Sequence, residues 1–323
     1  MGTSRNQAFR RVATAIGSSI VRAAAGLGGG TDVIVRIISS GEEDASGNIE
    51  SFDVPTGSIT IVPDAGVDFE LKLMGNSLIL KRGNKLQGFK ITSGDPSGSA
   101  AAIKLNAGGT PLKDMVINCT GITTSRAGRV GGGDKCVHVT SSVSGTVTLE
   151  NVRITIPSSQ SFVTGILHEG SGTLKVTNSS VVAVSSGQKQ GVVGIYGNTA
   201  VGSVEVVGST VSLSGIQASG GNVFAVLLSP IGSGRVEGSS IQVKEGNPPA
   251  IAIGVCVNAT DTVTVQRNRF TNVTNDPQSS TSIAIYKQAG DLVPTPITDN
   301  NTFNGFSTSS PDRRYVDSGF SCP

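Results

Sequence analysis

Tryptophan is absent from this 323-residue sequence, tyrosine occurs only 3 times and histidine only 2 times. Charged residues make up 15% of the chain, against about a quarter in typical soluble proteins, and the formal net charge is +2. Without aromatic platforms for bases or a basic stripe for phosphates, a role in nucleic-acid binding is disfavoured. No run reaches the ~20 apolar residues that a membrane-spanning helix needs.

Cysteine is also scarce, and its positions match no zinc-site spacing. The four cysteines are Cys119, Cys136, Cys256 and Cys322. Buried free thiols are the favoured interpretation, and one disulfide in which Cys322 holds the C-terminal tail is the alternative. The residues up to Asn6 lack the apolar core of a secretory signal, so we expect an exported protein to carry its signal outside this chain.

What the sequence does contain is a repeat of about 30 residues, built from short apolar runs and glycine turns. Its most regular part is a triplet of a small, an apolar and a variable residue. Such a repeat is typical of a solenoid, in which each coil packs only on its neighbours. The copies of the triplet are Ala102-Ile103-Lys104, Cys136-Val137-His138, Gly165-Ile166-Leu167, Gly194-Ile195-Tyr196, Ala225-Val226-Leu227, Gly254-Val255-Cys256 and Ala284-Ile285-Tyr286.

Segments of the repeat that begin at Gly145, Gly172, Gly202, Gly232 and Asp261 align without gaps. Alternation within them predicts two inward columns. The first column is Leu149, Val176, Val206, Val236 and Val265, and the second is Ile154, Val181, Val211, Ile241 and Phe270. The turn between the columns favours glycine and asparagine, which tolerate a left-handed backbone, and asparagine can hydrogen-bond from coil to coil. The turn residues are Asn151, Asn178, Gly208, Gly238 and Arg267.

These patterns predict an all-β fold, a single-stranded parallel β-helix of about nine coils with three strands per coil. Residues 1–30 are expected to form an N-terminal cap, because residues 8–27 have the pattern of an amphipathic helix. Such a helix would cover the open end of the stack and its strand edges. Residues 31–306 would form the β-helix, and residues 307–323 a C-terminal tail or cap.

The chain resembles the pectin-lyase-like superfamily of right-handed parallel β-helices, through its turn asparagines and its Asn268-Arg269-Phe270 and Asn301-Thr302-Phe303 pieces. Residues 8–16, 30–35 and 52–61 are similar to the opening of an uncharacterised bacterial branch of exported or envelope proteins. The match departs from that branch at Ser39-Ser40-Gly41-Glu42, which replaces a loop tyrosine. The resemblance implies a right-handed coil, but fold analogy carries little functional weight.

No catalytic set emerges from the charged residues. Lys175, Glu205 and Arg235 are expected on successive rungs of an outward column, as cross-strand ion pairs on a solvated face. Glu150 and Glu237 would lie about three rungs, ~14 Å, apart in the next column, too far for a paired-carboxylate mechanism.

A metal site is equally disfavoured. His138 and His168 fall one coil apart with opposite parity, which argues against a shared ion. The acidic run Glu42-Glu43-Asp44 is interpreted as a solvated loop, with weak calcium binding as the alternative. We therefore predict no catalytic residues, no metal and no cofactor.

The candidate binding site is an outward apolar stripe formed by the third triplet position, at Leu167, Tyr196, Leu227 and Tyr286, with Cys256 in the same row. An apolar stripe is unusual on the surface of a monomer. It would be a contact face for another subunit, a shelf for sugar rings, or a face covered by a loop or the C-terminal tail of the same chain. A column of small residues flanks it, at Gly165, Gly194, Ala225, Gly254 and Ala284.

The favoured function is a non-catalytic structural or adhesion protein, extracellular or in the cell envelope, that acts through a rigid elongated surface. The alternatives are a carbohydrate-active enzyme, either a polysaccharide lyase or a glycoside hydrolase, and a viral or phage fibre or tailspike module. The expected partners are further copies of the chain, an envelope assembly partner or a polysaccharide. We expect neither a nucleic-acid partner nor a membrane span.

Overall fold

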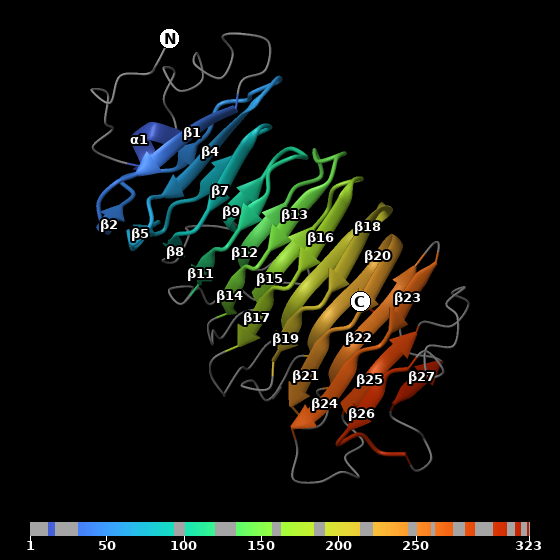
Figure 1. The fold of residues 1–323 in the computed structure, drawn as a ribbon. Helices are drawn as coiled ribbons and strands as arrows, with labels where there is room; N and C mark the ends of the chain where they lie inside the picture. The colour runs from blue at the N-terminus through green and yellow to red at the C-terminus, as the bar shows by residue number, and fades with distance from the viewer. Residues whose placement is uncertain are drawn as a thin grey trace.

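The structure is a computed structural model that describes residues 12–16, 32–93, 101–119, 134–156, 163–183, 191–213, 222–244, 251–259, 262–273, 282–287, 300–308, 314–317 and 322. Its strands form a 17-stranded and a 10-stranded sheet. They stack in sequence order into an elongated body, with the β1 and β27 ends far apart (Figure 1). The all-β solenoid of the right-handed type that the sequence predicts is confirmed.

The strands of the 10-stranded sheet follow one another in sequence order from β2 to β26, and each connection between neighbours is a crossover through the rest of the coil. Short strands of three to five residues make up the sheet, separated by the rest of each repeat. The strands are β2 (Gly41–Asp44), β5 (Phe69–Lys72), β8 (Lys90–Thr92), β11 (Val116–Asn118), β14 (Arg153–Ile156), β17 (Ser180–Ala183), β19 (Thr210–Ser212), β21 (Ser240–Lys244), β24 (Arg269–Val273) and β26 (Thr302–Asn304).

The 17-stranded sheet contains two parallel ladders, joined where β18 (Val192–Val207) and β20 (Val223–Glu237) run through both. One ladder holds β1 (Asp32–Ile37), β4 (Ser58–Pro63), β7 (Asn84–Gln87), β10 (Leu112–Lys113), β13 (Val147–Glu150), β16 (Thr173–Thr177) and β23 (Val263–Gln266). The other, which we call the triplet ladder, holds β3 (Ile49–Glu50), β6 (Leu78–Leu80), β9 (Ala101–Leu105), β12 (Asp134–Val139), β15 (Val163–His168), β22 (Ala252–Ala259), β25 (Ser282–Lys287) and β27 (Tyr315–Asp317).

The hydrophobic core lies inside the coil and contains every member of the two predicted inward columns. The middle residues of the triplets join the same core. Their register runs from Ile166 to Ile195 and on to Val226, one residue per rung. Stacking of like residues buries each aliphatic side chain against the rung above and below it, so no single coil carries a core of its own.

The predicted turn column is confirmed. The backbone is left-handed at Asn151, Asn178 and Arg267, with φ of 53°, 48° and 55°, and at Gly208 and Gly238, with φ of 58° and 57°. Asparagine and glycine are the residues that adopt this conformation at least cost, which explains the composition of the column. The equivalent turns at Gly88, Asp114 and Asn300 share it.

Most side-chain hydrogen bonds between coils are made by the residue that follows the turn position, not by the turn asparagines themselves. These residues form a row that we call the polar row. Each of its side chains accepts a hydrogen bond from a backbone N–H on the preceding rung, over 2.8–3.1 Å. At the turn position itself, Asn151 Nδ2 donates to Asp114 Oδ1 at 2.7 Å. The polar row consists of Ser179, Ser209, Ser239, Asn268 and Asn301.

At the N-terminal end, the described part of the expected helix is α1 (Val12–Ile16), and the remainder of residues 8–27 lies outside the described residues. Val12 and Ile16 belong to the core. The carboxylate of Glu43 accepts hydrogen bonds from the backbone N–H groups of Val12 and Ala13, at 2.5 and 3.1 Å. The acidic run around Glu43 therefore lies on strand β2, not in a solvated loop, because it pairs with β5 and anchors α1.

The favoured interpretation of the cysteines as free thiols is wrong, because all four form disulfides: Cys119–Cys136 and Cys256–Cys322. The first closes a short loop of the chain, with a sequence separation of 17. The second confirms the alternative in which Cys322 holds the C-terminal tail, and its partner lies in the triplet ladder, on β22.

Candidate functional site

The predicted stripe exists as a continuous row on the outer side of the triplet ladder. Leu167 on β15 pairs in register with Tyr196 on β18, which pairs with Leu227 on β20. Leu227 pairs with Cys256 on β22, and Cys256 with Tyr286 on β25. These side chains belong to a second hydrophobic cluster, which we call the outer cluster and which is distinct from the core inside the coil.

The stripe is not exposed within the single chain, which agrees with the alternative in which a loop or the C-terminal tail of the same chain covers it. The exposed fraction is 4% for Tyr196, 1% for Tyr286 and 0% for Leu167 and Leu227. A second row, which sequence reasoning missed, packs beside the stripe. It consists of Val193, Phe224, Ile253 and Ile283.

The second row was missed because strict alternation does not hold across the triplets. Val193 lies in the outer cluster, whereas Ile195, two residues later, lies in the core. The paired register skips the small residue between them, since Val193 pairs with Phe224 and Ile195 with Val226. An irregularity at Gly194 therefore reverses which residues of the strand face the core and which face outward. A small residue at the same place in every rung is the sequence signal that could have revealed it.

The small-residue column is a packing requirement of the core. A Cβ atom on Gly194 would lie 2.5 Å from the Ala225 carbonyl oxygen and 2.7 Å from Val211 Cγ1. At Gly254 it would lie 2.5 Å from the Ala284 oxygen and 3.0 Å from a Phe270 ring carbon. Since these neighbours are backbone and core side chains, glycine here does not mark a groove for a ligand.

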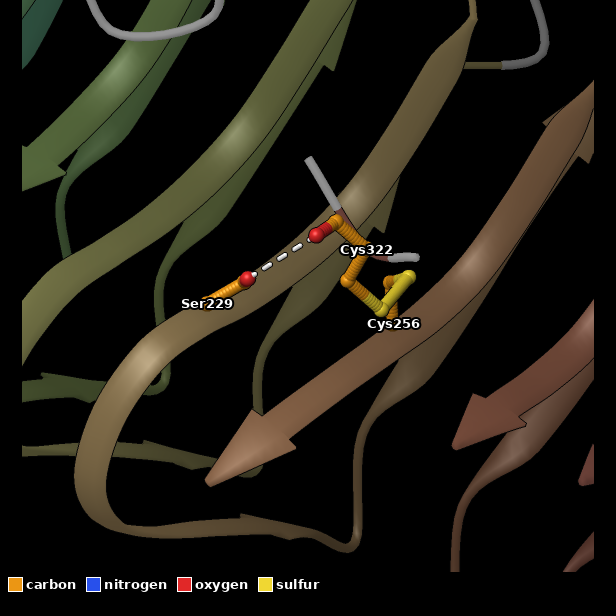
Figure 2. Close-up of a disulfide and its surroundings, with 3 residues drawn as sticks. All are labelled: Ser229, Cys256 and Cys322. Atoms are coloured by element: carbon orange, nitrogen blue, oxygen red, sulfur yellow. Dashed lines mark hydrogen bonds between the residues drawn. A yellow bond between two sulfur atoms is a disulfide. The ribbon is translucent and has the colours of Figure 1, made fainter. Parts of the chain in front are cut away.

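The C-terminal end of the chain lies on the stripe. Cys322 is 4% exposed and belongs to the outer cluster, bonded to Cys256 with a Cα–Cα distance of 6.1 Å. Ser229 Oγ donates a hydrogen bond to the Cys322 carbonyl oxygen at 3.3 Å (Figure 2). Cys322 therefore lies beside β20 and β22, whereas β27 pairs with β25 farther along the ladder.

Beyond Leu167 the outer row becomes polar, with His138 and Lys104 in register on β12 and β9. His138 Nε2 lies 2.6 Å from Glu169 Oε2. Burial lowers the pKa of His138, although the Glu169 carboxylate opposes this effect. Burial, with the charge of Glu169, raises the pKa of Tyr196 to about 12, so the phenol stays protonated at neutral pH.

The two histidines have the register that the sequence predicts. His168 pairs with Val139 and His138 with Leu167, so the two lie on adjacent rungs with opposite parity. His168 is fully buried, and its Nε2 lies 3.1 Å from the Gly172 carbonyl oxygen. In the part of the chain that the structure describes, no group of three or more His, Cys, Asp or Glu side chains is placed to hold a metal ion.

The charged columns have the predicted register. Lys175 pairs with Glu205, which pairs with Arg235, and Lys175 Nζ lies 3.5 Å from Glu205 Oε1. Glu150 and Glu237 are three rungs apart, through Thr177 and Val207.

Glu237 forms ion pairs with two arginine side chains. Its buried carboxylate contacts the guanidinium groups of Arg235 and Arg267. Arg235 thus pairs on its own strand rather than with Glu205. The arrangement neutralises a buried acid and does not oppose two carboxylates across a substrate.

Fold and site together define a parallel β-solenoid with a buried outer apolar cluster, to which Cys322 is joined by a disulfide. No protein-family model matches the chain, and no curated protein matches it. Among solved structures, the chain is similar to tailspike protein 3 of bacteriophage CBA120, with 12% sequence identity and a TM-score of 0.25. The match covers 94% of this chain and 59% of the tailspike chain, so the chain spans less than two thirds of that protein. At this TM-score the similarity carries no functional argument.

Proposed function

We propose that the protein is a non-catalytic structural or adhesion module that acts through a rigid, elongated surface. The observation that carries the proposal is the unbroken parallel stack from β2 to β26. At about 4.8 Å per rung, ten stacked strands make a rod roughly 43 Å long. A rod held by continuous ladders presents evenly spaced surface positions, which suits repetitive contacts with a partner.

The finer architecture belongs to the same proposal. We expect about nine coils with three strands each, a helical cap over residues 1–30, a solenoid over 31–306 and a tail or cap over 307–323. The amide contacts of Glu43 with Val12 and Ala13 support a cap at the β2 end.

The two disulfides support an extracellular or cell-envelope location, because disulfides persist mainly in oxidising compartments. Among the described residues, no helix is long and apolar enough to cross a membrane. The proposed partners are further copies of the chain or another envelope component, with a polysaccharide as the second choice.

A carbohydrate-active enzyme is the second candidate, and the contact between His138 and Glu169 beside the protonated Tyr196 is the observation that favours it. A hydrogen-bonded imidazole and carboxylate are groups that can move a proton. Both are partly accessible, with side-chain exposures of 17% and 31%.

The test separates the two candidates. Purified protein is incubated with neutral and uronic-acid polysaccharides, and reducing ends and the ultraviolet absorbance of unsaturated sugars are followed. We expect no products, and rods of uniform length by electron microscopy. Product formation that disappears in both His138→Gln and Glu169→Gln, but persists in the exposed control Lys113→Gln, would establish the enzyme instead.

A further inference from the structure

The outward side of the 10-stranded sheet carries an aligned row of polar side chains. Its strands β14, β17, β19, β21, β24 and β26 follow one another along one side of the molecule (Figure 1). The first outward residues of these strands pair in register, one per rung. We call this row, together with the row two residues further along each strand, the arginine face. The first row consists of Arg153, Ser180, Thr210, Ser240, Arg269 and Thr302.

Both arginines of the first row are exposed and have no carboxylate partner. Other arginines contact acids: Arg36 contacts Asp64, Arg82 contacts Asp53, and Arg235 and Arg267 contact Glu237. In the part of the chain that the structure describes, the guanidinium groups of Arg153 and Arg269 make no ion pair or hydrogen bond, and the arginine face contains no acid. Because arginine stays protonated at any relevant pH, this face keeps two positive charges that the chain itself does not neutralise.

The positions between the two arginines are uncharged and can form hydrogen bonds. The hydroxyls of Ser180 and Thr210 are half-buried, and they make no hydrogen bond within the described ranges. The second row runs from Thr155 to Asn304, and apart from Val182 it consists of hydroxyl and amide side chains. Such side chains both donate and accept, as the hydroxyls of a sugar do.

The spacing of the charges indicates the class of ligand. Arg153 and Arg269 are four rungs apart, which is ~19 Å at ~4.8 Å per rung. Duplex DNA carries one charge per ~1.7 Å of its axis and matches a much denser basic stripe. A protein partner is bound mainly through apolar and aromatic anchors, whereas the two rows hold one valine and no aromatic residue. A polymer with separated carboxylates among many hydroxyls fits this face better than either.

We propose that the arginine face binds an acidic, uronate-containing polysaccharide that lies along the rod. The inference rests on the proposed adhesion role and names its ligand. The guanidinium groups of Arg153 and Arg269 donate paired hydrogen bonds to two uronate carboxylates, and the hydroxyls between them exchange hydrogen bonds with the sugar. Each contact is weak because it is exposed to water, so binding depends on several rungs acting together.

The arginine face is separate from the candidate catalytic pair. His138 lies on β12 in the 17-stranded sheet, whereas Arg153 and Arg269 lie on β14 and β24 in the 10-stranded sheet. Binding at the arginine face therefore requires no catalysis at His138 and Glu169. A rod that binds a polysaccharide on this face without cleaving it would act as an adhesion module.

The test measures the affinity of the purified protein for immobilised polygalacturonate and alginate by biolayer interferometry. The matched ligand is fully methyl-esterified polygalacturonate, because esterification removes the carboxylate charge and keeps the sugar backbone. We expect the acidic polymers to bind at least tenfold more tightly than the ester. They should also bind at least tenfold more tightly than digalacturonate in competition, since a dimer is too short to reach both arginines.

Variants locate the binding on the molecule. The double variant Arg153→Gln with Arg269→Gln should lose at least tenfold in affinity, and its binding should depend less on salt. The matched control, Arg36→Gln with Arg82→Gln, removes the same charge from exposed positions off this face and should bind as the wild type does. Thr210→Val should weaken binding severalfold and keep the salt dependence, because it removes a hydroxyl and no charge. Circular dichroism checks that each variant keeps the fold.

The proposal is wrong if neither acidic polymer binds, if the ester binds equally well, or if the two double variants lose affinity equally. Tighter binding of duplex DNA than of the acidic polymers would assign the face to a nucleic acid instead. Affinity is measured separately from product formation and from rod length. The ligand assignment can therefore fail while the proposed structural role stands.

Discussion

The buried residue His168 links the stability of the folded chain to pH. Burial lowers the pKa of His168 below 6.5, with the Gly172 carbonyl opposing the shift. Its Nδ1 has no hydrogen-bond partner among the described atoms, which fits a neutral ring with the proton on Nε2. The unfolded chain binds a proton near pH 6.5, whereas the folded chain binds it only at lower pH.

We therefore predict that stability is full above about pH 6.5 and is lost as the pH falls through the folded-state pKa of His168. The slope from this residue is at most about 1.4 kcal/mol per pH unit. In His168→Gln the difference from wild type in unfolding free energy should shrink on acidification between pH 6.5 and 4.5, measured by urea denaturation. Parallel curves for the two proteins across this range would contradict the assignment.

The small residues of the triplets are the second feature at this scale. A Cβ on Gly194 would approach backbone and a core valine, neither of which can move freely. Gly194→Ala should therefore destabilise the protein by about 1–3 kcal/mol, the usual range for overpacking. Gly47→Ala is the matched control, since a Cβ there meets nothing within 4 Å. Urea midpoints of the two variants measure the difference, and equal midpoints would refute the packing argument.

At the scale of the strand and its turn, the side chains of the polar row accept hydrogen bonds from backbone N–H groups at the turns between strands. Ser209 Oγ accepts from the Ser179 N–H at 3.1 Å, and its single O–H lies between two carbonyl acceptors, Val207 O at 3.0 Å and Val176 O at 3.2 Å. The Ser209 side chain therefore links two rungs where the chain turns between sheets.

Ser209→Ala leaves the Ser179 N–H and two carbonyls with one partner fewer, in a buried site. We predict a loss of about 1–3 kcal/mol, the desolvation cost of a buried polar group without a partner. Ser142→Ala is the control, because the Ser142 hydroxyl contacts Thr140 and the Asn106 carbonyl at an exposed position. Thermal unfolding of both variants checks this; a control that loses as much as Ser209→Ala would show that burial is not the cause.

How far the sequence predicts an element depends on whether its period is local. The columns through Leu149 and Ile154, and the left-handed turns at Asn151 and Asn178, follow from alternation and from backbone preference within one repeat. The second apolar row was not predictable in this way, because the irregularity at Gly194 breaks the alternation. The cysteine pairs could not be predicted from local patterns either, because Cys256 and Cys322 are far apart in the sequence and meet only in the folded chain.

At the scale of the whole molecule, the sequence indicates a rod but not what covers it. The stripe at Leu167, Tyr196, Leu227 and Tyr286 lies in one outward row, and the cluster that it forms also includes Cys322, a residue near the chain end. In a solenoid each rung stabilises its neighbours, so a restraint at one end acts over a limited distance. The Cys256–Cys322 disulfide should therefore protect the C-terminal rungs and leave the N-terminal rungs unaffected.

Hydrogen exchange followed by mass spectrometry tests this directly. Removing the Cys256–Cys322 disulfide with Cys322→Ser should speed amide exchange in peptides from β25 and β27 at least tenfold, because the chain after the last strand loses its covalent link to β22. Peptides from β4 to β8 lie many rungs away and should exchange at the wild-type rate. Ser229→Ala, which removes the hydrogen bond to Cys322 but keeps the disulfide, should have an effect of the same sign and smaller size. Faster exchange spread evenly along the rod would instead mean that the molecule unfolds as one cooperative unit, and the disulfide would then have no local role.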